Sequence, residues 1–384
     1  MTANAHGMPE GSVVTAHAET EDTIFVASQW QLMWWRFRKH RLANIGATVV
    51  ILFYIGAIFC EFWAPYDPNT YERNLTFVPP MKVYLHSEGQ FHWPPVTYGL
   101  VRTRDPETYI ITYEEDRSVA YPLRFFVKGD SYRLWGLLDS DRHFFGLGGG
   151  EDDQRVYVLG TDRLGRDMFS RIFFGSRISL SIGLLGVFIS LVIGIIAGGF
   201  SGYLGGVLDE IMQRIIEFLR SIPTIPLWMA LSAALPREWS TVQRYFAIVV
   251  LLSLIGWTGL ARVVRGRFLA IREEDFVMAA RLQGANESRI VFRHMLPSFL
   301  SYIIASVTLS IPGMILGETS LSFLGLGLRP PTISWGVLLQ EAQNLQTVAL
   351  APWLLIPALF VVAAILSFNF MGDGLRDAAD PYSR

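Results

Sequence analysis

The chain has 384 residues, of which 51% are hydrophobic and only 17% are charged, and its mean hydropathy is +0.33. A soluble domain normally carries about 25% charged residues, so this composition argues against an ordinary soluble protein. The net charge of −2 says nothing about partners by itself, and the single cysteine, Cys60, excludes an internal disulfide or a zinc site built from cysteines.

Residues 1–42 form a polar tail that ends in an amphipathic helix. The tail has no short apolar core of the kind a secretory signal peptide needs. Trp30, Met33, Trp34 and Phe37 fall on one face of the expected helix, with basic residues on its flanks. Such a helix lies in the headgroup layer of a membrane. The alternative is a solvated tail with incidental tryptophans.

Six apolar segments are candidates for spanning a bilayer, whose hydrocarbon core of about 30 Å needs roughly 20 residues of helix. The first is too long for a signal peptide and is interpreted as a retained anchor. The third is the weakest, because Pro223 and Pro226 would kink it, and a re-entrant or buried segment is the alternative. The predicted spans are 43–63, 178–206, about 216–236, 245–261, 298–318 and 349–371.

The distribution of basic residues predicts the orientation, because short cytoplasmic loops are rich in Lys and Arg. With six spans, both termini lie on one side. The terminal side carries Arg36, Arg38, Lys39, Arg41, Arg214, Arg220, Arg262, Arg265, Arg267, Arg272, Arg281, Arg289, Arg293, Arg376 and Arg384. The short loops of the other side carry only Arg237, Arg244 and Arg329. The terminal side is therefore expected to be cytoplasmic.

Residues 64–158 are predicted to form a small β-rich lobe outside the membrane. Short aromatic and β-branched runs at 109–113, 120–127 and 132–138 are separated by Pro, Gly and Asp, a pattern typical of strands and turns. Three scattered histidines in the lobe, His86, His92 and His143, suggest no metal site. We hypothesise that the segment 80–150 is a docking or gating surface on the external side of the membrane. A purely structural insertion is the alternative.

The second span carries a small residue at every fourth position. Gly194, Gly198, Gly202 and Gly206 continue a series that starts at Gly186 and Ser190. In membranes, small residues at this spacing let helix backbones approach closely. We therefore expect this face to pack against another helix.

Residues 262–297, which precede the fifth span, are predicted to project into the cytoplasm as two short helices. Gly284 stands where a C-terminal glycine cap would, and Asn286 offers an N-cap oxygen to the next helix. Ala279 and Ala280 would leave a shallow surface that fits another protein's groove. An ordinary solvated loop is the alternative.

This loop resembles the "EAA" loop of ABC importer permeases through Met278–Ala280, Gly284, Ile290 and Leu296–Pro297, with methionine in place of the family's glutamate. Four further segments resemble signatures of the second, C-type subunit of the dipeptide, oligopeptide and nickel permeases. These segments are Ser28–Arg41, Leu159–Arg171 with Phe174–Leu180, Gly317–Gly327 and Asn369–Ala378. The resemblance covers about residues 28–64 and 155–384, whereas 80–150 exceeds what the family leads us to expect.

The resemblance implies an all-α membrane protein of the type I ABC importer kind, with a permease domain over 159–384 and a first helix at 43–63. It implies alternating access in a heterodimer with a homologous permease subunit, two cytoplasmic ATPases and an external solute-binding protein, in the inner membrane. The sequence contains no phosphate-binding loop, so ATP and Mg²⁺ are expected at the ATPases and no cofactor on this chain. Contact with the ATPases is assigned to Phe276, Met278, Ala279, Ala280, Gly284, Ile290, Leu296 and Pro297.

Glu318, near the end of the fifth span, is the remaining candidate, as a pore or gate residue. Solvation at the interface is the alternative. Two other classes of protein receive little support. An ion-coupled transporter would need acids near the bilayer midplane and internal repeats, and neither is visible in this sequence. An intramembrane enzyme would need paired aspartates or a serine–histidine pair in its spans, and this sequence shows neither. Nucleic-acid binding is not indicated. The sequence does not name the solute, and peptides are the commonest choice.

Overall fold

The computed structural model describes residues 28–379, apart from 88, 105, 108–110, 148–154 and 237. Tyr109, Arg237 and Arg384, which entered the predictions above, and most of the predicted tail lie outside the described residues. Five helices within this part are long and apolar enough to cross a membrane. They are α3 (Arg41–Ile58), α5 (Met168–Leu204), α8 (Thr241–Ile271), α12 (Leu300–Phe323) and α15 (Ile356–Ala379). The predicted mostly helical membrane fold with a small β lobe is confirmed.

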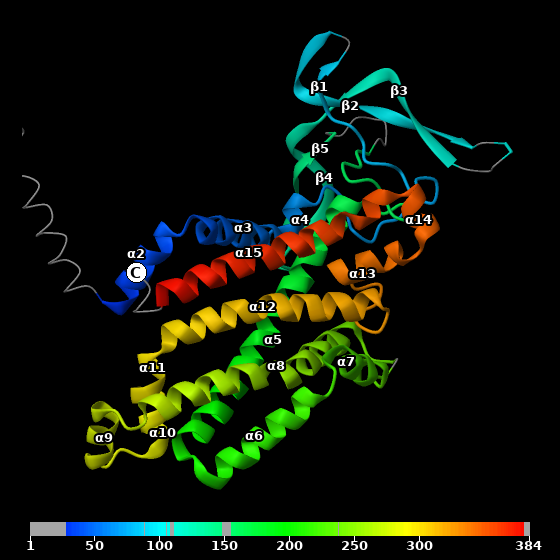
Figure 1. Cartoon of the computed structure of the whole chain (residues 1–384). Coiled ribbons are helices and arrows are strands. Elements are labelled where there is room, and N and C mark those ends of the chain that lie inside the picture. Colours follow the sequence, from blue (N-terminus) through cyan, green and yellow to red (C-terminus); the bar gives the residue numbers. More distant parts are fainter. Residues whose placement is uncertain are drawn as a thin grey trace, which may run out of the picture.

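The third predicted span, about 216–236, is not one continuous helix. It is divided between α6 (Gly206–Ser221) and α7 (Thr224–Ala233). The break falls at Pro223, because a proline disfavours helical backbone in the residue before it, and Ile222 is extended with φ −85° and ψ 128°. The two short helices together lead the chain back across the bundle to the start of α8 (Figure 1).

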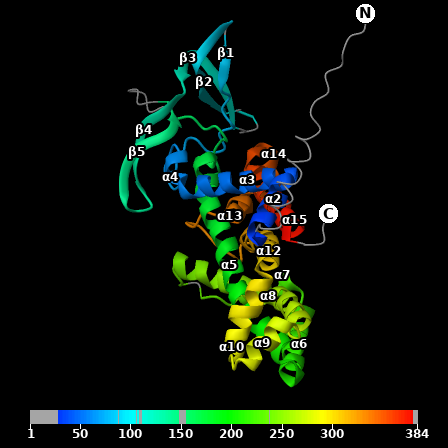
Figure 2. The ribbon, with the colours of Figure 1, turned by 90° about the vertical axis from the view of Figure 1, so that its left-hand side faces the viewer.

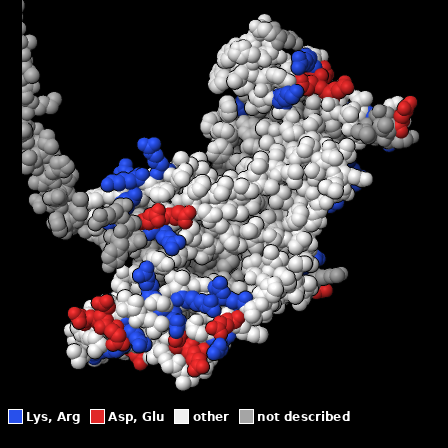
Figure 3. Space-filling model, viewed as in Figure 1, with Lys and Arg blue, Asp and Glu red and all other residues white. Residues whose placement is uncertain are grey.

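The two ends of the bundle differ in structure (Figure 1). One end, here called the loop end, holds α2 (Gln29–Lys39), α9 (Asp275–Leu282), α10 (Glu287–Arg289), α11 (Leu296–Ser298) and the last turn of α15. The opposite end, here called the lobe end, holds α4 (Cys60–Trp63), the strands, α13 (Trp335–Gln340) and α14 (Leu345–Leu350). Charged residues gather at the loop end and on the lobe, and a broad band between them is free of charge on the face shown in Figure 3.

The lobe contains two antiparallel sheets. β1 (Tyr84–Ser87), β2 (Gln90–Arg104) and β3 (Ile111–Pro122) form one, and β4 (Arg124–Leu134) and β5 (Leu138–Gly146) form a hairpin. In Figure 2, both sheets stand to one side of the helices, with the hairpin beside α4. A small apolar core holds the lobe on the polypeptide that leads into α5, and it consists of Val78, Met81, Leu123, Phe145, Val156 and Tyr157.

The glycine stripe of α5 packs against α8. A Cβ atom added to Gly202 would lie 2.7 Å from the backbone oxygen of Arg265, and one added to Gly194 would lie 3.0 Å from the Cβ of Leu260. Gly198 faces the backbone of Ala261 more closely still. Gly206 is an exception to the prediction: it begins α6 with φ +59°, and a Cβ atom there would meet nothing within 4 Å. It serves the turn after α5 and does not pack against a helix.

Replacing Gly198 with alanine should destabilise the bundle, because its Cβ would overlap the backbone of Ala261. Overpacking of this kind costs about 1–3 kcal/mol. The matched control is Gly199→Ala, whose Cβ would meet its nearest neighbour, Val291, at an ordinary 3.5 Å. Thermal unfolding of the two purified variants in detergent checks this expectation, and equal midpoints for both would contradict it.

Candidate functional site

The segment between α8 and α12 forms the predicted pair of short helices. α9 ends at Leu282, and Gly284, just after the cap residue, has φ +77°. The N–H of Ala285 donates to the carbonyl of Ala280 at 3.1 Å, as in a glycine-terminated helix. Asn286 then caps α10, because its Oδ1 accepts from the N–H of Arg289 at 2.8 Å. The two capping residues predicted from the sequence therefore have the expected local roles.

One face of α9 is anchored on the bundle. Val277 is fully buried and Ala280 is 6% exposed, and both belong to an apolar cluster with Phe268 of α8 and Ile303 of α12. The guanidinium of Arg281 lies over the ring of Tyr203 at the end of α5, 5.0 Å from its centroid. These contacts fix the orientation of α9 relative to three membrane helices.

The burial of Ala280 corrects one expectation. We expected both alanines to form an outward surface, but only Ala279 is exposed, whereas Ala280 is packed inside. Neighbouring residues on a helix point about 100° apart, so the sequence alone could not tell which alanine faces inward. A large side chain at position 280 would therefore disturb the attachment of α9 before it disturbed any partner.

Away from the bundle, α9 exposes apolar side chains together with an acid in its first turn. Phe276 is 42% exposed, Met278 is 40% exposed and Leu282 is 87% exposed. Leu282 was not among the predicted residues, although a leucine between Arg281 and Gln283 in a short surface helix is a signal that could have been used. Met278 and Leu282 are four positions apart and share one side of the helix, whereas Phe276 points in another direction.

The remaining predicted residues lie between α9 and α12. Ile290 is buried and begins a π-helical turn, Ile290–Met295, and Leu296 and Pro297 continue into α11. Pro297 is exposed and Leu296 is partly buried. Because π turns are rare and often lie at functional sites, this stretch is an unusual link between α9 and α12.

Glu318 lies inside the bundle, at the end of α12 that faces the lobe end. Its carboxyl group is fully buried and accepts hydrogen bonds from the hydroxyls of Ser322 and Ser334, both at 2.7 Å, and of Ser179 at 3.3 Å. The three serines come from α12, from the residue that caps α13, and from α5. In this chain Glu318 therefore joins three elements and is not solvated at an interface.

A buried ion network lies at the lobe end, in the Leu159–Arg171 segment. The carboxylate of Asp162 is fully buried and pairs with Arg171 and with Arg166, the latter at 2.6 Å. Arg166 also lies 3.2 Å from Glu341, which follows α13. Next to this network, burial raises the pKa of Asp167, the N-cap of α5, to about 6. The network attaches the start of α5 to the segment after α13.

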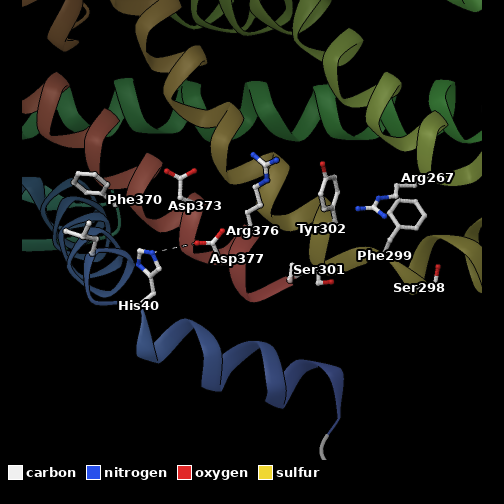
Figure 4. Close-up of a pocket in the computed structure, with 12 residues that line it drawn as sticks. His40, Arg267, Ser298, Phe299, Ser301, Tyr302, Phe370, Asp373, Arg376 and Asp377 are labelled. Atoms are coloured by element: carbon white, nitrogen blue, oxygen red, sulfur yellow. Dashed lines mark ion pairs between the residues drawn. The ribbon is translucent and has the colours of Figure 1, made fainter. Parts of the chain in front are cut away.

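A pocket of about 870 Å³ opens at the loop end, where α3, α12 and α15 begin or end (Figure 4). His40, at the junction of α2 and α3, lies 3.8 Å from Asp377 of α15. Arg267 of α8 lies over the ring of Tyr302 of α12, 4.6 Å from its centroid. Basic and acidic groups line the pocket together, so its charge favours neither sign. Among the described residues, no group of three His, Cys, Asp or Glu side chains could hold a metal ion.

Replacing Glu318 with alanine should lower the free energy of unfolding by about 1–3 kcal/mol, because buried hydroxyls lose their acceptor. Glu318→Gln keeps one acceptor oxygen and should cost less. Thermal unfolding of both variants in detergent measures the difference. If alanine and glutamine lower the midpoint equally, the hydrogen bonds from the three serines do not stabilise the bundle.

Comparison with known proteins gives two family matches. Residues 190–384 match the family described as "Binding-protein-dependent transport system inner membrane component", and residues 28–80 match "N-terminal TM domain of oligopeptide transport permease C". The first range holds α6 to α15 and the C-terminal part of α5, and the second holds α2 to α4. Neither range includes the strands of the lobe.

Among curated relatives, the oligopeptide transport system permease protein OppC of Bacillus subtilis is 30% identical over 358 residues, covering 93% of this chain and 91% of the relative. The dipeptide transport system permease protein DppC of Lactococcus lactis is 32% identical and covers 92% of this chain and 91% of the relative. DppC of Bacillus subtilis is 41% identical over 59% of this chain and 69% of its own length.

Among solved structures, an inward-facing MetNI methionine ABC transporter matches with 20% identity and a TM-score of 0.42, over 55% of this chain and 96% of the matched chain.

Proposed function

This chain belongs to the family of binding-protein-dependent transport system inner membrane components, and from this premise we propose that it carries peptides across the membrane with energy delivered through α9. It is a multi-pass inner membrane permease of the ABC importer type, similar to oligopeptide and dipeptide permeases. Its partners in this proposal are a homologous permease subunit, two ATPases that bind ATP and Mg²⁺, and an external binding protein. Solute crosses by alternating access between the two permease subunits.

The proposed coupling site is the exposed face of α9, and its shape is the observation that carries the proposal. Phe276, Met278 and Leu282 are exposed on a helix whose other face is buried against the bundle. Contact with an ATPase groove would remove these apolar side chains from water, which stabilises association by roughly 25 cal/mol per Å². A push on α9 would then reach α8 and α12 through Val277 and Ala280. Ile290 and Leu296 belong to the apolar cluster beneath this helix, whereas Pro297 is exposed and remains part of the proposed contact surface.

Peptides are the proposed solute because the relatives that match most of the chain are named for oligopeptides and dipeptides. Selectivity is expected to rest largely with the binding protein. The three-stranded sheet β1–β3 projects beyond the helices (Figure 1), which supports the proposal that this part of the lobe contacts the binding protein.

The proposed orientation places both termini and α9 in the cytoplasm. One observation supports it: the basic residues on α2, α9, α10 and the last turn of α15 gather at the loop end, and cytoplasmic loops are enriched in Lys and Arg. The ATPases would then meet α9, and the lobe would stand outside.

Leu282→Asp should weaken the association with the ATPases without unfolding the permease, because position 282 is 87% exposed. Burying a leucine contributes roughly 1.5–3 kcal/mol, so the affinity should fall about tenfold or more. Co-purification with the ATPases and peptide-stimulated ATP hydrolysis are the measurements. Ser288→Asp, an exposed site on α10, is the control.

Normal co-purification and normal stimulation for Leu282→Asp would contradict the assignment. Ala280→Arg gives a further comparison, because its side chain would overpack the cluster beneath α9. That variant should lower the thermal midpoint of the permease itself, whereas Leu282→Asp should not.

The orientation is tested with single cysteines on a Cys60→Ala background. A cysteine at Ser118, exposed on β3 of the lobe, should react with an impermeant maleimide applied to intact cells. A cysteine at Ser288 should react only after lysis. The reverse pattern would show that the loop end lies outside.

A further inference from the structure

The tip of the β4–β5 hairpin exposes a continuous apolar surface. Residues 134–138 contain no polar side chain. Trp135 is 48% exposed, Leu138 is 59% exposed and Leu137 is 80% exposed. Apolar side chains this exposed at the end of a hairpin are costly in water and need a covering surface.

The tip is held at the depth where the first membrane helix ends. The indole N–H of Trp135 donates to the carbonyl of Ile58 at 2.8 Å, and its ring lies 5.5 Å from that of Phe59. Ile58 is the last residue of α3, a helix apolar enough to span the membrane. A second contact joins Phe126 of β4 to Phe62 of α4, with ring centroids 6.0 Å apart. The hairpin therefore reaches down to the edge of the hydrocarbon layer.

The backbone conformation of the tip is one that tryptophan rarely adopts. Trp135 has φ +53° and Gly136 has φ +73°, and the N–H of Leu137 donates to the carbonyl of Leu134 at 3.0 Å, so the two residues are the left-handed central pair of a tight turn within the three-residue loop. Glycine, asparagine or aspartate normally occupy the first of these positions, and a bulky residue there is strained. Phe126, with φ +56° and 61% exposure, is a second such aromatic on the hairpin. The turn itself does not require aromatic side chains at these strained, exposed positions. Residues held in such conformations are often functional.

Charged residues mark where water begins. Directly above the tip, Arg133 pairs with Asp139 across the hairpin at 2.8 Å, and both side chains are exposed. Further along, Lys128 pairs with Asp141 at 3.4 Å. The apolar run ends where the first ion pair starts, so the hairpin has a narrow apolar end and a polar stem.

The exposed tip continues the lipid-facing side of α3. On this helix Ile51 is 58% exposed, Leu52 is 60% exposed and Ile55 is 40% exposed, and Ile58 follows beside Trp135. Tryptophan is enriched at membrane interfaces, where its ring lies among headgroups. We propose that the β4–β5 tip is a membrane anchor: residues 134–138 lie in the interfacial layer of the leaflet at the lobe end, and phospholipid covers them. The anchor holds the lobe at a fixed height and angle beside α3.

The test attaches an environment-sensitive fluorophore to Leu137→Cys on a Cys60→Ala background. The full chain is purified with the subunits that accompany it and is placed in phospholipid nanodiscs. Phospholipids with a nitroxide high on the acyl chain should quench most of the emission, whereas aqueous iodide should quench little. Ser118→Cys, on the other sheet of the lobe, should show the opposite pattern. Leu138→Cys gives a second reporter site if the first variant does not fold.

Two results would overturn the proposal. Quenching at position 137 by iodide alone, as at 118, would place the tip in water. Protection from both quenchers would place it against a protein subunit. As a further check, a Leu138→Asp substitution should reduce lipid quenching of the fluorophore at 137, because an aspartate at the tip disfavours insertion into the interface.

Discussion

The close contact between α5 and α8 is the interaction on which the rest of the structure depends. Lipid offers no hydrophobic drive for two apolar helices to associate, so they associate through close packing. Gly194, Gly198 and Gly202 provide this by letting the backbone of α8 approach. The contact brings Tyr203 of α5 beside Phe268 of α8. α9 packs on these two side chains through Val277 and Ala280. The packing of α5 against α8 inside the membrane therefore sets the position of α9, which lies beyond the end of the bundle.

The sequence predicted those features that local chemistry decides. Gly284 and Asn286 are recognisable because a left-handed glycine and an N-cap oxygen satisfy backbone groups within a few residues of themselves. The broken third span was foreseeable in part, since Pro223 acts on the residue before it. Apolar spans were predictable because the bilayer fixes their length.

Features that depend on distant residues were not predictable. Solvation at the interface was the alternative for Glu318, but Ser179 and Ser334, far away in the sequence, approach it from other elements. Whether Ala279 or Ala280 faces outward depends on how α9 is rotated, which the cluster around Phe268 sets. The aromatic and β-branched runs of the lobe predicted strands, but not that Trp135 would contact the end of α3.

The burial of Glu318 limits how the lobe end can deform. Its carboxyl group holds α5, α12 and the start of α13 together through three serine hydroxyls. Sliding α12 away from α5 at this level would break the hydrogen bond between Ser179 and Glu318, at a cost of about 1 kcal/mol. The hydrogen bonds therefore favour movement of these elements as one body. An opening at this end of the permease is then expected from movement of that body as a whole, and not from a split within it.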